Sequence, residues 1–200
     1  MPRHADPQLE QRILSAAERL WRKDGERTLT MRAVARSAGT TTPTVYERFR
    51  NRDEILRALI LRSQARLYRE IEPSRSLAEL WARMLAYCCE FPHEYELLSS
   101  DLIAKLEHPR PNLEFALARA AEWFGGRPND HYPLILALWS LLQGTIALLK
   151  TLPHKQHGAT LSSATTAARV LIRNRVAFTR AKVRESLRET PIRRRRRPQR

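Results

Sequence analysis

Apolar residues recur along most of the chain at the spacing of an α-helix. Residues 7–24 predict a first helix, with Asp6 as its N-cap, Pro7 at its first position and Gly25 at its end. The apolar face of this helix consists of Leu9, Ile13, Ala16, Ala17, Leu20 and Trp21.

Two shorter helices, with Thr30 and Thr42 as their N-caps, are predicted to meet at Gly39 within residues 30–49. Such a pair is typical of a helix-turn-helix, and it is equally typical of a corner in a helical bundle. The residues expected on the buried faces are Met31, Val34, Ala35 and Ala38 in the first helix and Val45, Tyr46 and Phe49 in the second.

The remainder of the chain also predicts helices, which prolines and glycines separate. Asn51 and Glu54 form a capping-box pattern at the start of the next helix, which ends at about Ile71, before Pro73. No alternating run is long enough to predict a sheet, so the expected fold class is all-α. Further helices are expected over residues 74–91, 93–108, 112–124, 132–152 and 160–188.

The composition permits a globular core and indicates a polyanionic partner. Hydrophobic residues make up 42% and charged residues 28% of the 200 residues, as in ordinary soluble domains. The net charge of +15 is uneven: residues 1–60 carry 12 basic and 8 acidic side chains, residues 61–160 carry 11 of each, and residues 161–200 carry 13 and 2. A positive net charge favours nucleic acid as a partner, but it does not show which residues make the contact.

A basic tail over residues 191–200 has no apolar anchor and is expected to be disordered. Its arginine run, residues 193–197, has three interpretations. It is a flexible arm that adds non-specific phosphate contacts, a segment that contacts RNA or a membrane surface, or a solvated tail without a role.

The chemistry of the second short helix strengthens the helix-turn-helix interpretation, although a bundle corner, with the threonines as caps and Tyr46 as a packed aromatic, stays equally open. Short side chains at Thr41, Thr42, Pro43 and Thr44 let the start of this helix approach a base edge or a phosphate closely. The free N–H groups at a helix N-terminus also favour anions. Arg48 and the other basic side chains that follow are suited to phosphate.

With these features, the run from Ile13 to Leu56 resembles the N-terminal domain of the TetR family of transcriptional regulators. The resemblance extends over about 45 residues without a gap. Its marks are Ala16-Ala17, Gly25, Thr30, the Ala38-Gly39 turn, Tyr46 with Phe49, and Arg52-Asp53-Glu54.

The resemblance implies an all-helical homodimer that binds a near-palindromic operator in double-stranded DNA and is released by a small apolar effector. It implies a repressor, with activation as the alternative. It also divides the chain into a three-helix helix-turn-helix domain over residues 1–52, a helical effector-binding and dimerisation domain over residues 53–190, and the basic tail 191–200.

The resemblance further implies a role for each matching position. Arg48 and Arg52 stand where His and Lys are common, and both changes keep a hydrogen-bond donor. Glu47 either points away from DNA or accepts from a cytosine amino group. The residues that would face bases or sugar edges are Thr42, Pro43, Thr44, Tyr46 and Arg32. The residues that would hold phosphates are Thr30, Thr41, Arg48 and Arg52.

Large or polar side chains within apolar stretches of the C-terminal part are candidate effector contacts, because small-molecule sites are mostly apolar and aromatic. Each of them also fits ordinary core packing. Gln143 stands out, because a buried amide needs partners from a ligand or a neighbouring helix. The candidates are Trp81, Met84, Tyr87, Cys88, Phe91, Tyr95, Trp123, Phe124, Trp139 and Gln143.

The stretch 134–149 is strongly apolar, but it is shorter than the roughly 20 residues that a membrane span needs. We therefore expect a soluble helix that is buried on more than one side. The resemblance places it, with the last helix, in a four-helix dimer interface, where Gly144 would permit a close approach. A core helix within one chain is the alternative.

Several other functions lack positive support in the sequence. Cys88 and Cys89 are adjacent, and the first ten residues have no apolar signal core, which together favour a reducing cytoplasm. His154 and His157 have no neighbouring carboxylate or cysteine for a metal site, and neither a cofactor motif nor a catalytic motif is present. The competing functions are a non-specific nucleic-acid binder driven by the tail, and a ligand carrier or enzyme on a helical scaffold.

Overall fold

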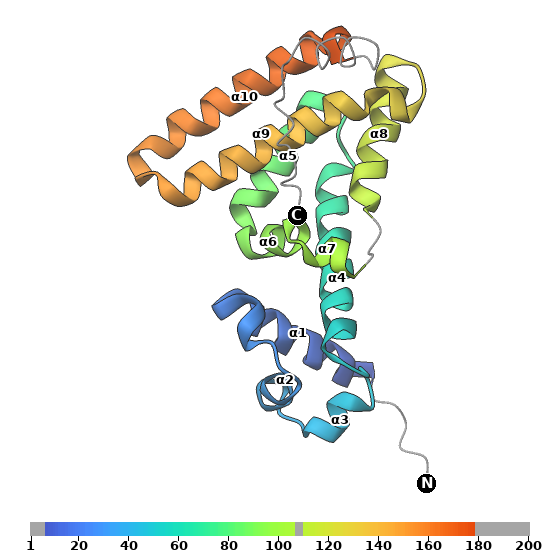
Figure 1. Ribbon diagram of the computed structural model, residues 1–200, viewed down its shortest axis with the longest axis vertical. Coiled ribbons are helices and arrows are strands. Elements are labelled where there is room, and N and C mark those ends of the chain that lie inside the picture. The colour runs from blue at the N-terminus through green and yellow to red at the C-terminus, as the bar shows by residue number, and fades with distance from the viewer. Residues whose placement is uncertain (1–6, 107–109, 179–200) are drawn as a thin grey trace, which may run out of the picture. The chain divides into compact units, whose positions relative to one another are not determined.

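The computed structural model describes residues 7–106 and 110–178, and every regular element in these ranges is a helix (Figure 1). The prediction of an all-α fold is confirmed. The chain divides into two compact units, residues 1–73 with 84–112 and residues 74–83 with 113–200. The expected domain limits at residues 52 and 190 stay a prediction, and the tail lies outside the described residues.

The first unit contains the two short helices of residues 30–49 and the segments that pack on them. In Figure 1, α1, α2 and α3 lie together beside the start of α4. The elements of this unit are α1 (Pro7–Asp24), η1 (Gly25–Thr28), α2 (Met31–Ala38), α3 (Thr42–Tyr46), α4 (Arg52–Ile71), the end of α5 (Leu77–Glu90), α6 (Pro92–Ser99) and α7 (Leu102–Lys105), where η denotes a 3-10 helix.

One hydrophobic core joins the helices of the first unit. Ile13 of α1, Val34 of α2 and Val45 of α3 are completely buried in it. Full burial of such a side chain contributes about 1.5–3 kcal/mol. Helices α4, α6 and α7 close the same core with Ile55, Leu56, Leu59, Ile60, Leu97, Leu102 and Ile103, and Leu106 follows directly after α7.

Local sequence signals set both ends of α2 as expected. The Thr30 hydroxyl caps α2 by accepting from the Ala33 N–H at 3.1 Å. Gly39 ends α2 in the left-handed region at φ 67°, which other residues adopt at a cost. Asn51 caps α4 through the Glu54 N–H, but the Glu54 carboxylate accepts from the N–H of the residue before Asn51, so the capping box is incomplete.

Two expected helices end earlier than predicted. The helix expected over 93–108 is divided into α6 and α7, because Ser100 is extended (φ −70°, ψ 163°) and its hydroxyl donates to the Leu97 carbonyl at 2.8 Å. The last helix, expected over 160–188, runs from His157 to Arg173 as α10. The Asn174 side chain donates to the Val170 carbonyl at that end, and residues 179–188 lie outside the described residues.

The second unit is built on α9 and α10, which pack side by side (Figure 1). The Trp81 indole N–H donates to the Leu138 carbonyl of α9 at 3.2 Å and fixes the start of α5 on this pair. The remaining elements are α8 (Pro111–Phe124, which belongs here from Leu113), η2 (Pro128–His131), α9 (Tyr132–Thr151), η3 (His154–Gln156), α10 (His157–Arg173) and η4 (Arg175–Phe178).

Among the described residues, helix α9 is buried on only one side. By length and composition, α9 together with η2 is long and apolar enough to cross a bilayer. Core helices of soluble proteins pass the same test. Within the 18-residue window that meets it, 33% of the helix is buried. The expectation of burial on more than one side, which was tied to a dimer interface, stays a prediction, because only one chain is described. The exposed face of α9 comprises Tyr132, Leu136, Ser140, Gly144, Ala147, Leu148, Lys150 and Thr151.

Candidate nucleic-acid interface

The turn between α2 and α3 brings the predicted DNA contacts onto one small part of the first unit. After the left-handed Gly39, the Thr40 N–H donates back to the Ala35 carbonyl at 3.0 Å. The chain then extends at Thr41 (φ −96°, ψ 155°) and enters α3. The N-cap Thr30 of α2 is exposed, as is Arg32 in the first turn.

Thr41, and not Thr42, is the N-cap of α3. Its hydroxyl oxygen accepts from the Thr44 N–H at 3.3 Å and lies 2.8 Å from the Thr44 hydroxyl. Thr42 is instead the first helical residue, and Pro43 follows it. The difference of one residue arises because both threonines suit a cap, and the extended backbone at Thr41 selects the first.

Tyr46 is exposed, contrary to the expectation that it belongs to the buried stripe of α3. Its side chain is 52% accessible, whereas Val45 is completely buried and Phe49 nearly so. A helix of five residues is not stable by itself, so these two apolar side chains hold α3 against the core. Tyr46 is consequently free to contact another molecule.

The two predicted phosphate-binding arginines differ in their surroundings. Arg48 is half-buried, and its Nε atom is buried without a hydrogen-bond partner among the described residues. Arg52 is engaged inside the protein, because its Nε donates to the Leu29 carbonyl at 2.8 Å and its guanidinium also contacts Glu26.

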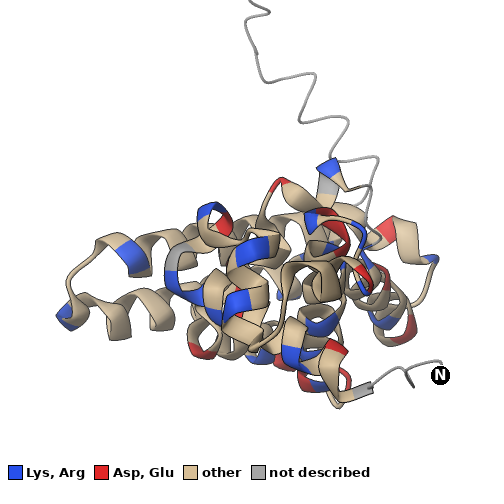
Figure 2. Ribbon diagram, turned by 90° about the horizontal axis from the view of Figure 1, so that it is seen from below, with Lys and Arg blue, Asp and Glu red and all other residues tan. Residues whose placement is uncertain are grey.

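The charge at this end of the first unit is mixed. Figure 2 looks onto it and shows Lys and Arg interspersed with Asp and Glu. Arg36 of α2 is an exposed cation close to the turn, and the sequence analysis did not identify it as a candidate. Glu47 is exposed at the end of α3. The amphipathic pattern of α2 already placed Arg36 on its polar face, but periodicity alone gives an exposed arginine no role.

Five candidate effector residues lie in the first unit, near the junction of α5 and α6. Tyr87, Cys88 and Tyr95 are buried, and Met84 and Phe91 are half-buried. The Tyr87 and Phe91 rings lie 5.2 Å apart between centroids. The structure thus brings these candidates together, but each of them is also packed in the unit.

The other candidates lie in the second unit. Trp81 is buried, whereas Trp123, Phe124, Trp139 and Gln143 are half-buried. Trp123 carries the Arg119 guanidinium over its ring at 4.7 Å, and Arg175 lies over Phe124 at 4.5 Å. A cavity of about 280 Å³ is lined by Ser76, Ala78, Glu79, Trp81, Ala82, Thr165, Ala168 and Arg169.

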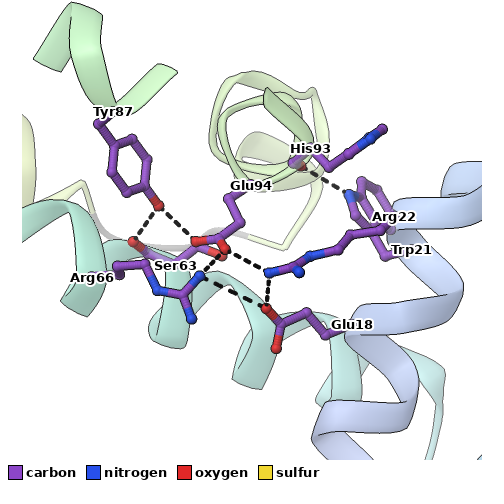
Figure 3. A network of polar contacts seen from close by, with 8 residues as sticks. All are labelled: Glu18, Trp21, Arg22, Ser63, Arg66, Tyr87, His93 and Glu94. Atoms are coloured by element: carbon purple, nitrogen blue, oxygen red, sulfur yellow. Dashed lines mark hydrogen bonds and ion pairs between the residues drawn. The ribbon is translucent and has the colours of Figure 1, made fainter. Parts of the chain in front are cut away.

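A buried carboxylate that the sequence did not single out ties four helices of the first unit together (Figure 3). Glu94 of α6 is 5% exposed. It accepts from Arg22 of α1 at 3.1 Å, from Arg66 of α4 and from the Tyr87 hydroxyl of α5 at 2.8 Å. Because a buried carboxylate is costly without partners, the three donors fix the place of α6.

Two further contacts strengthen the same junction. Glu18 of α1 accepts from Arg22 at 2.7 Å, and the Trp21 indole N–H donates to the His93 carbonyl of α6 at 3.1 Å. Burial is the main cause that raises the pKa of Tyr87 far above its usual value, and the hydrogen bond to Glu94 raises it further. Tyr87 therefore remains a donor throughout the physiological pH range.

The N-terminal segment matches a known family. Residues 13–59 match the family model of the bacterial regulatory proteins of the tetR family. This segment extends from α1 into α4 and includes the complete α2–turn–α3 arrangement. No sequence among the curated proteins matches the chain.

Solved structures share the fold over most of the chain. A TetR-like transcriptional regulator from Rhodococcus sp. RHA1 has 17% sequence identity and a TM-score of 0.55, over 88% of this chain and 99% of its own. A TetR-family transcriptional regulator from Haemophilus influenzae RD has 18% identity and a TM-score of 0.50, over 82% and 98%. The SmeT–triclosan complex has 20% identity and a TM-score of 0.53, over 80% and 91%.

Replacement of Glu94 by glutamine is expected to destabilise the protein by about 1–3 kcal/mol, because charge-assisted bonds to Arg22 and Arg66 are lost while the shape is kept. The free energy of unfolding in urea measures the effect. Glu96→Gln, an exposed glutamate on the same helix, is the matched control and should change stability by less than about 0.5 kcal/mol. Equal stability of the two variants would contradict a structural role for the network.

Proposed function

We propose that this chain, a TetR-family transcriptional regulator, represses transcription by binding a near-palindromic operator as a homodimer, and that a small apolar effector releases it. TetR-family regulators are DNA-binding proteins and not enzymes. The observation that carries the operator proposal is the exposed, threonine-led start of α3, which buried Val45 and Phe49 hold on the core. The cytoplasm, where the genome lies, is the proposed location.

The side chains around α3 divide by chemistry into base readers and phosphate contacts. A threonine methyl or a proline ring can touch a thymine methyl, and an arginine can bond a guanine edge. Arg48 has a buried Nε without an acceptor among the residues that the structure describes, which favours a phosphate as its partner. The proposed base or sugar contacts are Thr42, Pro43, Thr44, Tyr46 and Arg32, and the proposed phosphate contacts are Thr30, Thr41 and Arg48.

Alanine at Tyr46 or Thr44 is expected to weaken binding to an operator selected from random DNA by about 5- to 150-fold, or ~1–3 kcal/mol for each base-facing contact. Fluorescence anisotropy with the selected duplex and a scrambled duplex measures the loss. Tyr68→Ala removes another exposed tyrosine, on α4, and should bind as the unaltered protein does. Unchanged operator affinity in both α3 variants would count against the proposal.

The competing function, a non-specific binder driven by the arginine tail, makes a different prediction. Deletion of residues 191–200 should lower affinity for all DNA equally if the tail adds only phosphate contacts. The ratio between selected and scrambled duplex should therefore be kept. If sequence preference disappears with the tail, the operator proposal fails.

The exposed face of α9 supports the proposed dimer. Leu136 is 42% exposed and Leu148 is exposed to a similar degree, although α9 is the most apolar helix of the described chain. Small side chains at Ser140 and Gly144 lie between them, and they permit close helix packing. An apolar stripe of this kind is typical of an interface between protein chains. Helix α10 also exposes small and apolar side chains at helical spacing, namely Ala159, Ser163, Thr166 and Val170.

Leucine at Gly144 is expected to convert the dimer into a monomer. A Cβ atom at this position meets nothing within 4 Å in the chain itself, so the added side chain obstructs only a partner. Leucine also favours a helix by up to about 1 kcal/mol over glycine, so the monomer should remain folded. Sedimentation velocity measures the mass, and Ala65→Leu on the exposed side of α4 is the control. A dimeric G144L variant would contradict the proposed interface.

The aromatic group of the first unit supports an effector that acts through Glu94. Tyr87 is one of the candidate effector contacts, and its hydroxyl donates to the carboxylate that also holds Arg22 of α1. An effector that displaces Tyr87 would change the support of α1, and with it the core that holds α3. Such a switch requires that the effector bind the two states with different affinity.

A thermal-shift screen of aromatic and apolar compounds is expected to identify a ligand that also releases the operator. Triclosan, the compound in the SmeT complex, is the first probe. At 100 times its dissociation constant a ligand stabilises the folded state by about 2.7 kcal/mol. Tyr87→Phe keeps the ring but loses the bond to Glu94, so it should retain ligand binding, bind the operator more weakly without ligand, and show little further release when ligand is added. Equal release from both proteins would contradict this route.

A further inference from the structure

We infer that Arg52 is a positioning residue, which fastens the start of α2 to α4 so that Thr30 is presented to DNA, and that it does not itself bind phosphate. This inference rests on the proposed operator-binding function. It concerns one side chain at the first position of α4 and the short segment that leads from η1 into α2.

The Arg52 guanidinium binds that segment through hydrogen bonds from two adjacent nitrogen atoms. Its Nε donates to the Leu29 carbonyl at 2.8 Å, and its Nη2 donates to the Glu26 carbonyl at 3.0 Å. Nη2 also lies 3.0 Å from the Glu26 carboxylate. The planar fork of arginine suits several acceptors at once, whereas the ammonium of lysine is a single point charge on a flexible stem.

The bound segment ends at the N-cap of α2. The Leu29 side chain is buried in the core, and its carbonyl is held by Arg52. The next residue, Thr30, is extended (φ −113°, ψ 151°) and bonds the Ala33 N–H. Thr30 is therefore fixed through its neighbour, by burial of the Leu29 side chain and by the bond from Arg52 to the Leu29 carbonyl.

The surroundings of Arg52 weaken the case for a phosphate contact. The Glu26 carboxylate already neutralises the guanidinium, whose side chain is 33% exposed. A phosphate would have to compete with this carboxylate and with two backbone carbonyls. The pair Arg52–Glu26 carries no net charge, so it releases few counterions when DNA binds.

Arg52→Lys separates the two roles, because lysine keeps the positive charge and loses the fork. If Arg52 positions α2, the variant should bind the selected operator about fivefold more weakly, the effect of losing a helix cap worth about 1 kcal/mol. If Arg52 binds phosphate, lysine should bind nearly as well as arginine, and this result would overturn the inference.

The salt dependence gives a second and independent readout. Loss of one phosphate contact lowers the slope of log affinity against log salt by about 0.9. Positioning predicts that Arg52→Gln weakens binding at every salt concentration and leaves the slope unchanged. A slope reduced by about one contact in the glutamine variant would overturn the inference.

Amide hydrogen exchange in the protein without DNA tests the positioning directly. The Ala33 N–H, which bonds Thr30, should exchange faster in Arg52→Lys than in the unaltered full-length protein. Arg27→Lys is the matched control, because Arg27 is exposed in the same 3-10 turn, and it should leave both exchange and operator affinity unchanged.

These measurements distinguish failure of the inference from failure of the proposed function. Absence of sequence preference in the unaltered protein would defeat the operator proposal, whereas the exchange at Ala33 would still decide whether Arg52 holds α2. Unchanged exchange at Ala33 in Arg52→Lys would overturn the inference in either case.

Discussion

Helix α3, the proposed DNA-reading helix, depends on the burial of two side chains, Val45 and Phe49. Helix α3 has five residues, too few to be stable as an isolated helix in water. Its shape and direction therefore come from the core into which these side chains are packed. The proposed DNA contacts of α3, such as the exposed Tyr46, lie away from the side that Val45 and Phe49 bury in this core.

Hydrogen bonds and ion pairs fix the positions of the surrounding helices, which apolar packing alone does not specify. Apolar packing is not directional, whereas a carboxylate or a guanidinium fixes its partners within about 3 Å. Glu94 holds α6 on α1, α4 and α5, and Arg52 holds the segment before α2 on α4. Helix α4 takes part in both sets of contacts, so its position bears on both ends of the first unit.

The sequence predicted those features that local chemistry decides. Thr30 and Gly39 end helices through bonds within a few residues, and the structure confirms both. Tyr46 was misassigned because a short helix offers too few turns to define its buried face. The N-cap of α3 is Thr41 and not the predicted Thr42, because two adjacent threonines are equally suitable caps.

The features that sequence alone could not supply are long-range. Arg22 meets Glu94 across 72 residues, and Arg52 meets the Leu29 carbonyl across 23. Neither spacing belongs to a repeating pattern, so no periodicity marks these pairs. The apolar character of α9 indicated burial, but composition cannot say whether the cover comes from the same chain, and Leu136 is exposed among the described residues.

The shared core of the first unit also bears on modularity. Leu97, Ile103 and Leu106, which follow α5 near the middle of the chain, complete the hydrophobic interior beneath α1 to α4. A DNA-reading head transplanted into a chimera without these residues would expose apolar surface where they now pack. Recombination between relatives would therefore preserve this protein best if α1–α4 and α6–α7 were inherited as one block, although α5 separates them in the chain.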